Sequence, residues 1–354
     1  MANVDFNLTL SLKQSGNWIK TCPERHFFLE GPPGIGKSSI MGFLKDTLGD
    51  AYNYCYFDCA SKDLGDIAIP AVDRDKKVAE YFLNAIFHLQ HGGNNKPVVI
   101  MLDEFTKNVA VQNMLHTLLE PHNPRLGNVS LPDGSIVFIT GNLASNGVGD
   151  HIKGHSLNRL TRIRVRSPNA DEWIEWAVTH DIEPVVMAWV KNYPECLSSD
   201  TSLNKYGYDP KRMQDACVTP RSLEGASKLI KVRHLNDHET LTAVLAGTIG
   251  EAAARDMEAY IAYQDQLPAW ELIIKHPKTT DVPSNAGACF VMAYRAIQAV
   301  DKNNIDAWMT YLERFEPEYQ AAFCINIAKN PAKQQIAFAS KKFADWVRSN
   351  EDIL

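Results

Sequence analysis

The residues Gly31-Pro32-Pro33-Gly34-Ile35-Gly36-Lys37-Ser38 form a glycine-rich loop of the pattern G-x-x-x-x-G-K-S. An apolar run, Phe27-Phe28-Leu29, precedes the loop, and residues 39–44 have helical spacing, which begins at Ser39. Glycines let successive backbone N–H groups turn toward one point, and a helix N-terminus adds positive potential there. The sequence therefore predicts a nucleoside triphosphate site, with Lys37 reaching the β and γ phosphates and Ser38 a ligand of Mg²⁺.

Two carboxylates follow a second apolar run. Residues 98–102 are all apolar and Asp103 and Glu104 come directly after them. An α/β sheet delivers side chains to its ligand crevice at the carboxyl ends of its strands. In phosphoryl transfer the metal needs an acidic partner, which suits Asp103, and the attacking water needs a group to orient and deprotonate it, which suits Glu104.

A third apolar run, residues 136–140, leads to Asn142. An asparagine after a strand is usually a turn former. As the next strand after the paired acids, however, it places an amide where it could touch the γ-phosphate or the lytic water. We therefore include Asn142 among the expected catalytic residues.

The composition is that of an ordinary globular protein, with 354 residues, 45% hydrophobic and 22% charged. Its formal net charge of −6 argues against a protein that mainly coats nucleic acid, because that affinity comes from clustered Lys and Arg. The first residues lack the basic and apolar regions of a signal peptide, and no apolar run has membrane-spanning length. We expect a cytoplasmic protein without membrane contact.

Seven cysteines, an odd number with scattered spacing, suit reduced thiols. The close pair Cys55 and Cys59 lies in a run that reads as a strand, and no second Cys or His pair sits at zinc spacing. We expect core thiols rather than a metal site.

The order of patterns predicts an α/β fold with a parallel five-stranded sheet, because short apolar runs alternate with longer connections. Beyond Arg166 the pattern becomes mainly helical, including one long helix over residues 241–263. We expect three domains: an α/β nucleotide-binding core over residues 1–168, an α-helical lid over 169–266 and a C-terminal helical extension over 267–354. The five expected strands cover residues 27–29, 52–57, 98–102, 136–140 and 163–165.

This order of parts resembles the AAA+ ATPases, and more closely the MoxR-type branch that includes the NorQ and CbbQ activators of bacteria, with related members in bacteriophages. Residues 31–38 match the family's Walker A element, Leu102-Asp103-Glu104 its Walker B element and Asn142 its sensor 1. The resemblance implies a P-loop AAA+ core, ATP as the nucleotide with Mg²⁺, and self-assembly into a ring, expected to be a hexamer.

Two arginines follow from the same resemblance. The segment Ser156-Leu157-Asn158-Arg159-Leu160 is similar to the family's L-D-R-F segment, whose Arg reaches a neighbouring subunit's nucleotide. Here Asn158 replaces the usual acid, so Arg162 competes with Arg159 for this role. Thr219-Pro220-Arg221-Ser222-Leu223 resembles the sensor 2 segment of the helical lid. Guanidinium groups suit the negative charge that develops on a γ-phosphoryl group.

Two further segments resemble loops of this branch. Residues 63–70 are similar to a D-L-x-G-x-P loop that follows strand 2 and lies toward the ring's central opening, and an ordinary turn is the alternative. Residues 126–135 would form a hairpin before sensor 1 that projects toward a substrate or partner.

These features predict a ring-forming, chaperone-like Mg-ATP hydrolase that remodels or activates a protein, and the resemblance implies a partner with a von Willebrand factor A domain. Two alternatives stay open: a DNA-associated motor or loader built from the same parts, and an ATP-gated assembly scaffold with little turnover. The residues themselves do not distinguish ATP from GTP, because none of these motifs contacts the base.

Overall fold

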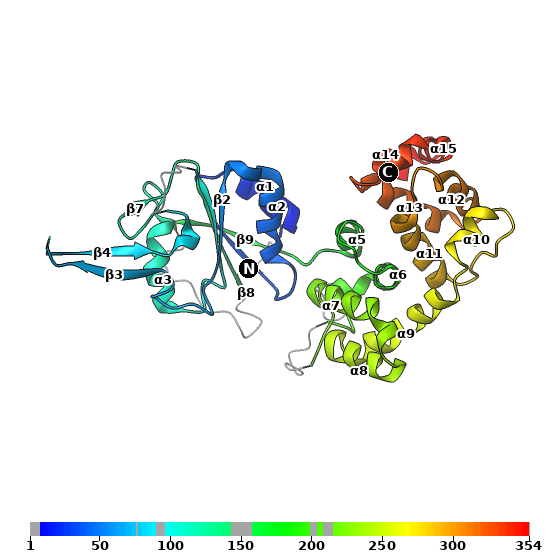
Figure 1. Ribbon diagram of the computed structural model, residues 1–354, viewed down its shortest axis with the longest axis horizontal. Helices are drawn as coiled ribbons and strands as arrows, with labels where there is room; N and C mark the ends of the chain where they lie inside the picture. The colour runs from blue at the N-terminus through cyan, green and yellow to red at the C-terminus, as the bar shows by residue number, and fades with distance from the viewer. Residues whose placement is uncertain are drawn as a thin grey trace, which may run out of the picture. The chain divides into compact units, whose positions relative to one another are not determined.

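The computed structural model describes residues 8–75, 77–89, 96–142, 158–198, 204–207 and 215–353. The chain divides into two compact units, Met1–Ser167 and Pro168–Leu354. The first unit is built on a five-stranded parallel sheet and the second, where described, is helical (Figure 1). The expected fold class, an α/β core followed by a mainly helical region, is confirmed.

The central sheet has the strand order β2-β5-β8-β1-β9. All four neighbouring pairs are parallel, and each strand contains most of one apolar run expected from the sequence. The strand that precedes the glycine-rich loop lies beside β8, and β8 in turn separates it from the strand that bears the acids. The strands are β1 (His26–Gly31), β2 (Asn53–Asp58), β5 (Val98–Asp103), β8 (Ile136–Asn142) and β9 (Leu160–Arg164).

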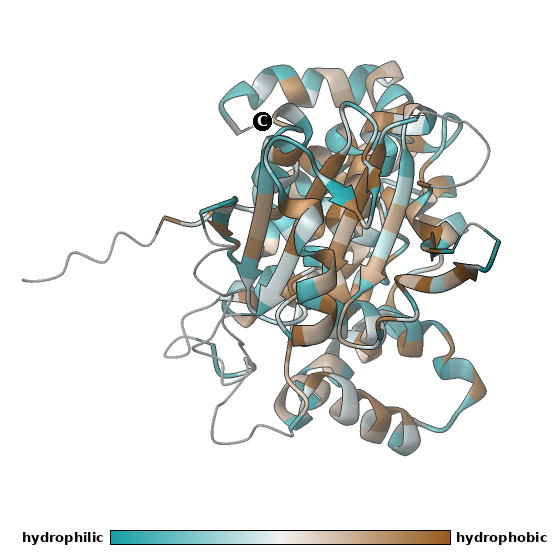
Figure 2. Ribbon diagram, turned by 90° about the vertical axis from the view of Figure 1, so that its left-hand side faces the viewer, coloured by the Kyte–Doolittle hydropathy of each residue, from teal (hydrophilic) through white to brown (hydrophobic). Residues whose placement is uncertain are grey.

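Each face of the sheet has its own apolar core, because successive side chains of a strand point to opposite faces. On one face, helices α1 (Leu12–Thr21) and α2 (Ile40–Leu48) cover residues such as Leu29 and Phe138. On the other, α3 (Val109–Leu115) and the 3₁₀ turn that continues it, His116–Leu119, pack against residues such as Ile100 and Ile139. Both faces are thus buried over the central strands, which is why β1, β5 and β8 contain continuous apolar runs rather than alternating patterns. Figure 2 shows these long hydrophobic segments.

Among its described residues, the connection from β2 to β5 contains no α-helix. Its described residues contain an antiparallel hairpin, β3 (Ala68–Asp73) and β4 (Val78–Leu83), and a 3₁₀ turn, Ala85–Phe87. Only the base of the hairpin is buried, at Ala68 and Leu83. A short second hairpin, β6 (Arg125–Leu126) with β7 (Val129–Ser130), precedes β8 and confirms the hairpin expected there.

The second unit contains helices around one apolar core that runs from Ala170 to Phe343. The single helix expected over residues 241–263 is wrong, because Gly250 has a φ of 87° and divides it into α8 and α9. The helices are α5 (Ala170–Ala177), α6 (Pro184–Asn192), α7 (Pro220–Lys231), α8 (His238–Ile249), α9 (Glu251–Gln266), α10 (Trp270–Lys275), α11 (Ala286–Ala299), α12 (Ile305–Leu312), α13 (Pro317–Lys329), α14 (Gln334–Ala339) and α15 (Lys341–Ser349). The separation of a lid from a C-terminal extension at residue 266 stays a prediction.

Candidate functional site

The chemistry-bearing residues of the first unit meet at the carboxyl edge of the sheet. The strand register pairs Gly31 with Asn142 and Asp58 with Asp103. Because the strands are parallel, the glycine-rich loop after β1, the acids after β5 and the amide after β8 all leave the sheet at this edge. The geometry therefore brings together three segments that are far apart in the sequence.

The loop has the backbone that its glycines allow. Gly34 and Gly36 have φ values of 76° and 97°, a region that favours glycine. A Cβ atom at Gly31 would lie 2.6 Å from the carbonyl oxygen of Val165, so the close approach of the chain after β9 requires glycine there. Ile35, only 2% exposed, anchors the loop in the core.

The expected helix after the loop is present. A 3₁₀ turn, Lys37–Ser39, leads directly into α2. The Ser39 hydroxyl donates to the carbonyl of Gly36 at 2.7 Å and closes this turn. Pro32 and Pro33 precede the turn, so the loop backbone is held at both ends around a region where N–H groups can face a phosphate.

Lys37 is 9% exposed, and its ammonium group bridges the loop and β8. It donates to the carbonyls of Gly31 and Pro32, both at 2.8 Å, and to Oδ1 of Asn142 at 3.2 Å. A phosphate-binding cation and an amide that can position a water thus lie within hydrogen-bonding distance of each other.

Asp103 accepts hydrogen bonds from three hydroxyl groups. Ser38 Oγ and Tyr56 OH donate to Oδ2, at 3.1 and 2.7 Å, and Thr140 Oγ1 donates to Oδ1. The sequence pointed to Ser38 and Asp103 but missed Tyr56 and Thr140. Both lie on β2 and β8, the strands that flank β5. No local sequence motif predicts this strand order.

The donor set fits a magnesium ion. Ser38 and Asp103 offer hydroxyl and carboxylate oxygens, which are ligands for Mg²⁺, and this ion is usually bound by one or two carboxylates together with substrate phosphates. In the described part of the chain, no three His, Cys, Asp or Glu side chains gather as a larger cage would require.

The thiols Cys55 and Cys59 lie in the core instead. Both are fully buried, and burial raises the pKa of Cys55 to about 12 and raises that of Cys59 as well. A thiol must lose its proton to bind a metal, so these two are poor ligands.

Glu104 occupies an unusual backbone position. Its φ is 49°, which is uncommon for a residue with a side chain and costs about 1–3 kcal/mol. The amide of Glu104 donates to Thr140 Oγ1 at 3.3 Å and the next amide, of Phe105, donates to the carbonyl of Thr140 at 3.1 Å. These contacts with β8 hold the chain in the turn that follows the acids.

The two competing arginines have different surroundings. Arg162, on β9, makes a two-point ion pair with Glu30, whose side chain is only 8% exposed. Arg162 thus neutralises a buried carboxylate. Arg159 precedes β9 at the amino edge of the sheet, because Leu160 pairs with His26, the first residue of β1. The six residues from His26 to Gly31 span about 17 Å, so Arg159 lies at the opposite edge from the loop of its own chain.

Arg221 lies in the second unit, in the first turn of α7. The helix begins at Pro220 after the N-cap Thr219, as expected, and the Arg221 side chain is exposed. Its sensor 2 role stays a prediction. Ser156 and Leu157, which belong to the segment around Arg159, lie outside the described residues.

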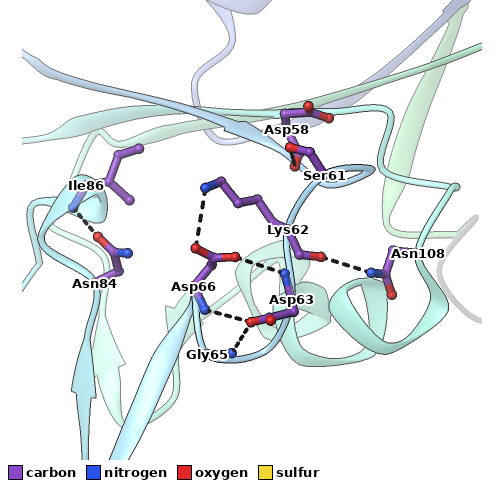
Figure 3. Close-up of polar contacts among 9 residues, drawn as sticks. All are labelled: Asp58, Ser61, Lys62, Asp63, Gly65, Asp66, Asn84, Ile86 and Asn108. Carbon is purple, nitrogen blue, oxygen red and sulfur yellow. Dashed lines mark hydrogen bonds and ion pairs between the residues drawn. The ribbon is translucent and has the colours of Figure 1, made fainter.

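The loop expected over residues 63–70 is a turn followed by strand β3, so Pro70 belongs to the hairpin. Figure 3 shows the turn: Asp63 Oδ1 accepts from the amides of Gly65 and Asp66, and Lys62 pairs with Asp66. Asn108 connects this turn to α3. Its Nδ2 donates to the carbonyl of Lys62 at 3.0 Å, while its Oδ1 caps the first turn of α3.

No protein-family profile and no curated protein matches the chain. Solved structures with partial similarity include a candidate ATPase from Cytophaga hutchinsonii, 13% identical, with a TM-score of 0.33 over 69% of this chain and 82% of that one. NtrX from Brucella abortus, in complexes with ADP and with ATP, is 13% identical, with TM-scores of 0.37 and 0.38 over 97% of this chain and 67% of that one. In the described residues, no helix is long and apolar enough to cross a membrane.

Proposed function

We propose that the chain is an Mg-ATP-dependent AAA+ ATPase. The observation that carries this proposal is the convergence at one sheet edge of Lys37, the Ser38–Asp103 contact and Asn142. Such a group combines a cation, a metal ligand pair and a polar amide beside a loop that can cradle phosphates, which are the parts that phosphoryl transfer requires.

Each residue has a distinct task in the proposed reaction. The backbone of residues 31–39 and the Lys37 ammonium group bind and orient the phosphates. Ser38 and Asp103 would hold Mg²⁺, which when bound neutralises phosphate charge. Glu104 takes a proton from the attacking water, and Asn142 positions that water. For Arg221 we keep the sensor 2 role that the resemblance implies.

The proposed site is completed by a second subunit. Arg159 lies at the sheet edge opposite its own loop, and this position supports our proposal that its guanidinium serves the nucleotide of a neighbouring subunit. This supports assembly into a ring in which each site lies between two chains, as the resemblance to hexameric AAA+ proteins suggests.

We further propose the MoxR-type activity of remodelling or activating a protein partner, with a von Willebrand factor A domain protein as the expected class. The β3–β4 hairpin supports a protein-directed function. Ile69, Val72, Tyr81 and Phe82 on it are 52–71% exposed, and exposed apolar patches typically mark interaction sites. Pro70 on β3 and the aromatic side chains of Tyr81 and Phe82 on β4 would supply contact area for a protein.

The central test replaces Glu104 by Gln. We expect hydrolysis to fall at least 100-fold because the water loses its base, while ATP binding changes little because Glu104 is not a phosphate ligand. Asp133→Asn, at the exposed turn before β8, is the matched control and should retain full activity. Equal hydrolysis by Glu104→Gln and the control would contradict the proposal and favour the scaffold function.

The partner is tested with the same variant. In the presence of ATP, Glu104→Gln should hold its client long enough for capture, and the combination with Tyr81→Ser and Phe82→Ser should lose that capture. Retention of the same client by the hairpin variant would exclude the hairpin as the contact surface. The DNA-associated motor is tested by measuring ATP hydrolysis with and without DNA across a salt series. A DNA stimulation that falls steeply with salt would favour the motor, since contacts with DNA phosphates have a steep salt dependence.

A further inference from the structure

Arg159 is held by two side chains of its own chain. Its Nη1 lies 2.9 Å from Glu120 Oε1, and 2.9 and 3.2 Å from Nε2 and Nδ1 of His116. The Arg159 and Glu120 side chains are 28% and 34% exposed, so the pair is partly shielded from water. Among the described residues all these contacts use Nη1. The opposite side of the guanidinium, with Nε and Nη2, therefore keeps its donors for a phosphate oxygen.

The two holding residues come from a single rigid segment. His116 begins the 3₁₀ turn that continues α3, and Glu120 directly follows that turn. Leu115, just before the turn, and Leu118 and Leu119 within it are fully buried in the core on this sheet face. The backbone positions of His116 and Glu120 are therefore fixed by packing rather than by the ion pair alone.

The segment that ends at Glu120 begins at Glu104, the second of the paired acids. Lys107 donates its amide to the carbonyl of Glu104, and Asn108 then caps α3. From Val109 to Leu119 the helix and turn cover about 18 Å, which is the length of the sheet strands. One continuous element thus leads from the acids at the carboxyl edge to the residues that hold Arg159 at the amino edge.

We propose that Glu120 and His116 are positioning residues for Arg159, and that the segment 104–120 ties the placement of this arginine to the acids of its own chain. The inference rests on the proposed trans role of Arg159. A long arginine side chain has many rotamers, and holding one side of the guanidinium selects those that point the other side outward. His116 must be neutral to contribute, because only a neutral imidazole can accept from Nη1.

The test is a double-mutant cycle of Glu120→Gln and Arg159→Ala, measured by single-turnover ATP hydrolysis and nucleotide binding in the assembled protein. We expect Arg159→Ala to lower the rate about 10³-fold or more. Glu120→Gln alone should lower it about 10- to 100-fold with nucleotide affinity unchanged, because misplacing a reacting group by about 1 Å costs that much. In the Arg159→Ala background, Glu120→Gln should cause no further loss.

Each other result has a defined meaning. If Glu120→Gln lowers the rate by the same factor in both backgrounds, or has no effect alone, the positioning role is wrong while the proposed function stands. If Arg159→Ala itself hydrolyses ATP normally, the trans site of the proposed function fails.

Further variants distinguish a loss of arginine positioning from a general loss of folding. His116→Leu should repeat the pattern of Glu120→Gln, and Glu120→Asp, which keeps a carboxylate, should recover part of the rate. If Glu120→Gln does not fold, the cycle is carried out with His116→Leu, and an additive result there overturns the proposal. Asp345→Asn, which removes the acid of the Arg348–Asp345 pair in α15, is the ion-pair control and should hydrolyse ATP normally.

Discussion

Lys37→Met is the sharpest test of the phosphate site, since it keeps the length of the side chain and removes its charge. At about 4 Å from a phosphate charge and an effective dielectric constant of about 20, the ammonium contributes about 4 kcal/mol. Lys37 is 9% exposed, so this environment is appropriate. The loss corresponds to about a 10³-fold increase in the dissociation constant for ATP.

Thermal unfolding with and without Mg-ATP measures this difference. At 100 times the dissociation constant, a ligand stabilises the folded protein by about 2.7 kcal/mol, which raises the Tm of a unit of this size by about 5–11 °C. At the same ATP concentration the variant would have only about one tenth of its sites occupied and gain about 0.06 kcal/mol. Its Tm should not move measurably with ATP.

Without nucleotide, Lys37→Met should keep a Tm within a few degrees of the parent protein. The variant loses the contacts with Gly31, Pro32 and Asn142, but it also avoids the cost of burying an ammonium group. Lys45→Met, an exposed change on α2, is the matched control and should show the full ATP-dependent shift. An undiminished shift in Lys37→Met would refute the assignment of this loop as the phosphate site.

Three further outcomes follow from particular contacts. Thr140→Val removes a hydroxyl that donates to Asp103 and should raise the Mg²⁺ concentration for half-maximal hydrolysis about tenfold; an unchanged value would contradict the metal role of Asp103. Arg162→Met leaves the carboxylate of Glu30 unpaired at 8% exposure and should lower the free energy of unfolding by about 1–3 kcal/mol in urea titrations, less than for a fully buried pair because Arg162 is itself half exposed. Gly250→Ala should lower the free energy of unfolding by about 1–3 kcal/mol, because the φ there is 87° and the new Cβ would lie 2.7 Å from the Ala216 carbonyl oxygen. Gly247→Ala in α8 meets no atom within 4 Å and should raise the free energy of unfolding by up to about 1 kcal/mol. Equal effects of the two changes would contradict the strain at Gly250.

The sequence was sufficient for the parts of the site whose chemistry is local. The glycine-rich loop and its helix depend on residues 31–39, which are adjacent in the chain, and a strand that ends in acids is equally a local pattern. The central strands β1, β5 and β8 were predictable because both faces of the sheet are buried there, so each contains a continuous apolar run. The edge strands β2 and β9 are partly exposed.

The errors have equally physical causes. The long helix over residues 241–263 was expected because small apolar residues continue across Gly250, and only the left-handed backbone there divides α8 from α9. The β3–β4 hairpin was missed since most of its apolar side chains are exposed, so no buried face imposed the alternation by which strands are recognised.

Only the tertiary structure decided which side chains meet. Tyr56 and Thr140 reach Asp103 because β2 and β8 flank β5, and strand order depends on how the whole sheet packs rather than on any short segment. For the same reason the sequence, which pointed to Arg159, left Arg162 as a competing candidate. In the fold, Arg162 pairs with the buried carboxylate of Glu30, whereas Arg159 lies at the amino edge of the sheet beside Glu120 and His116. The trans role of Arg159 stays a prediction.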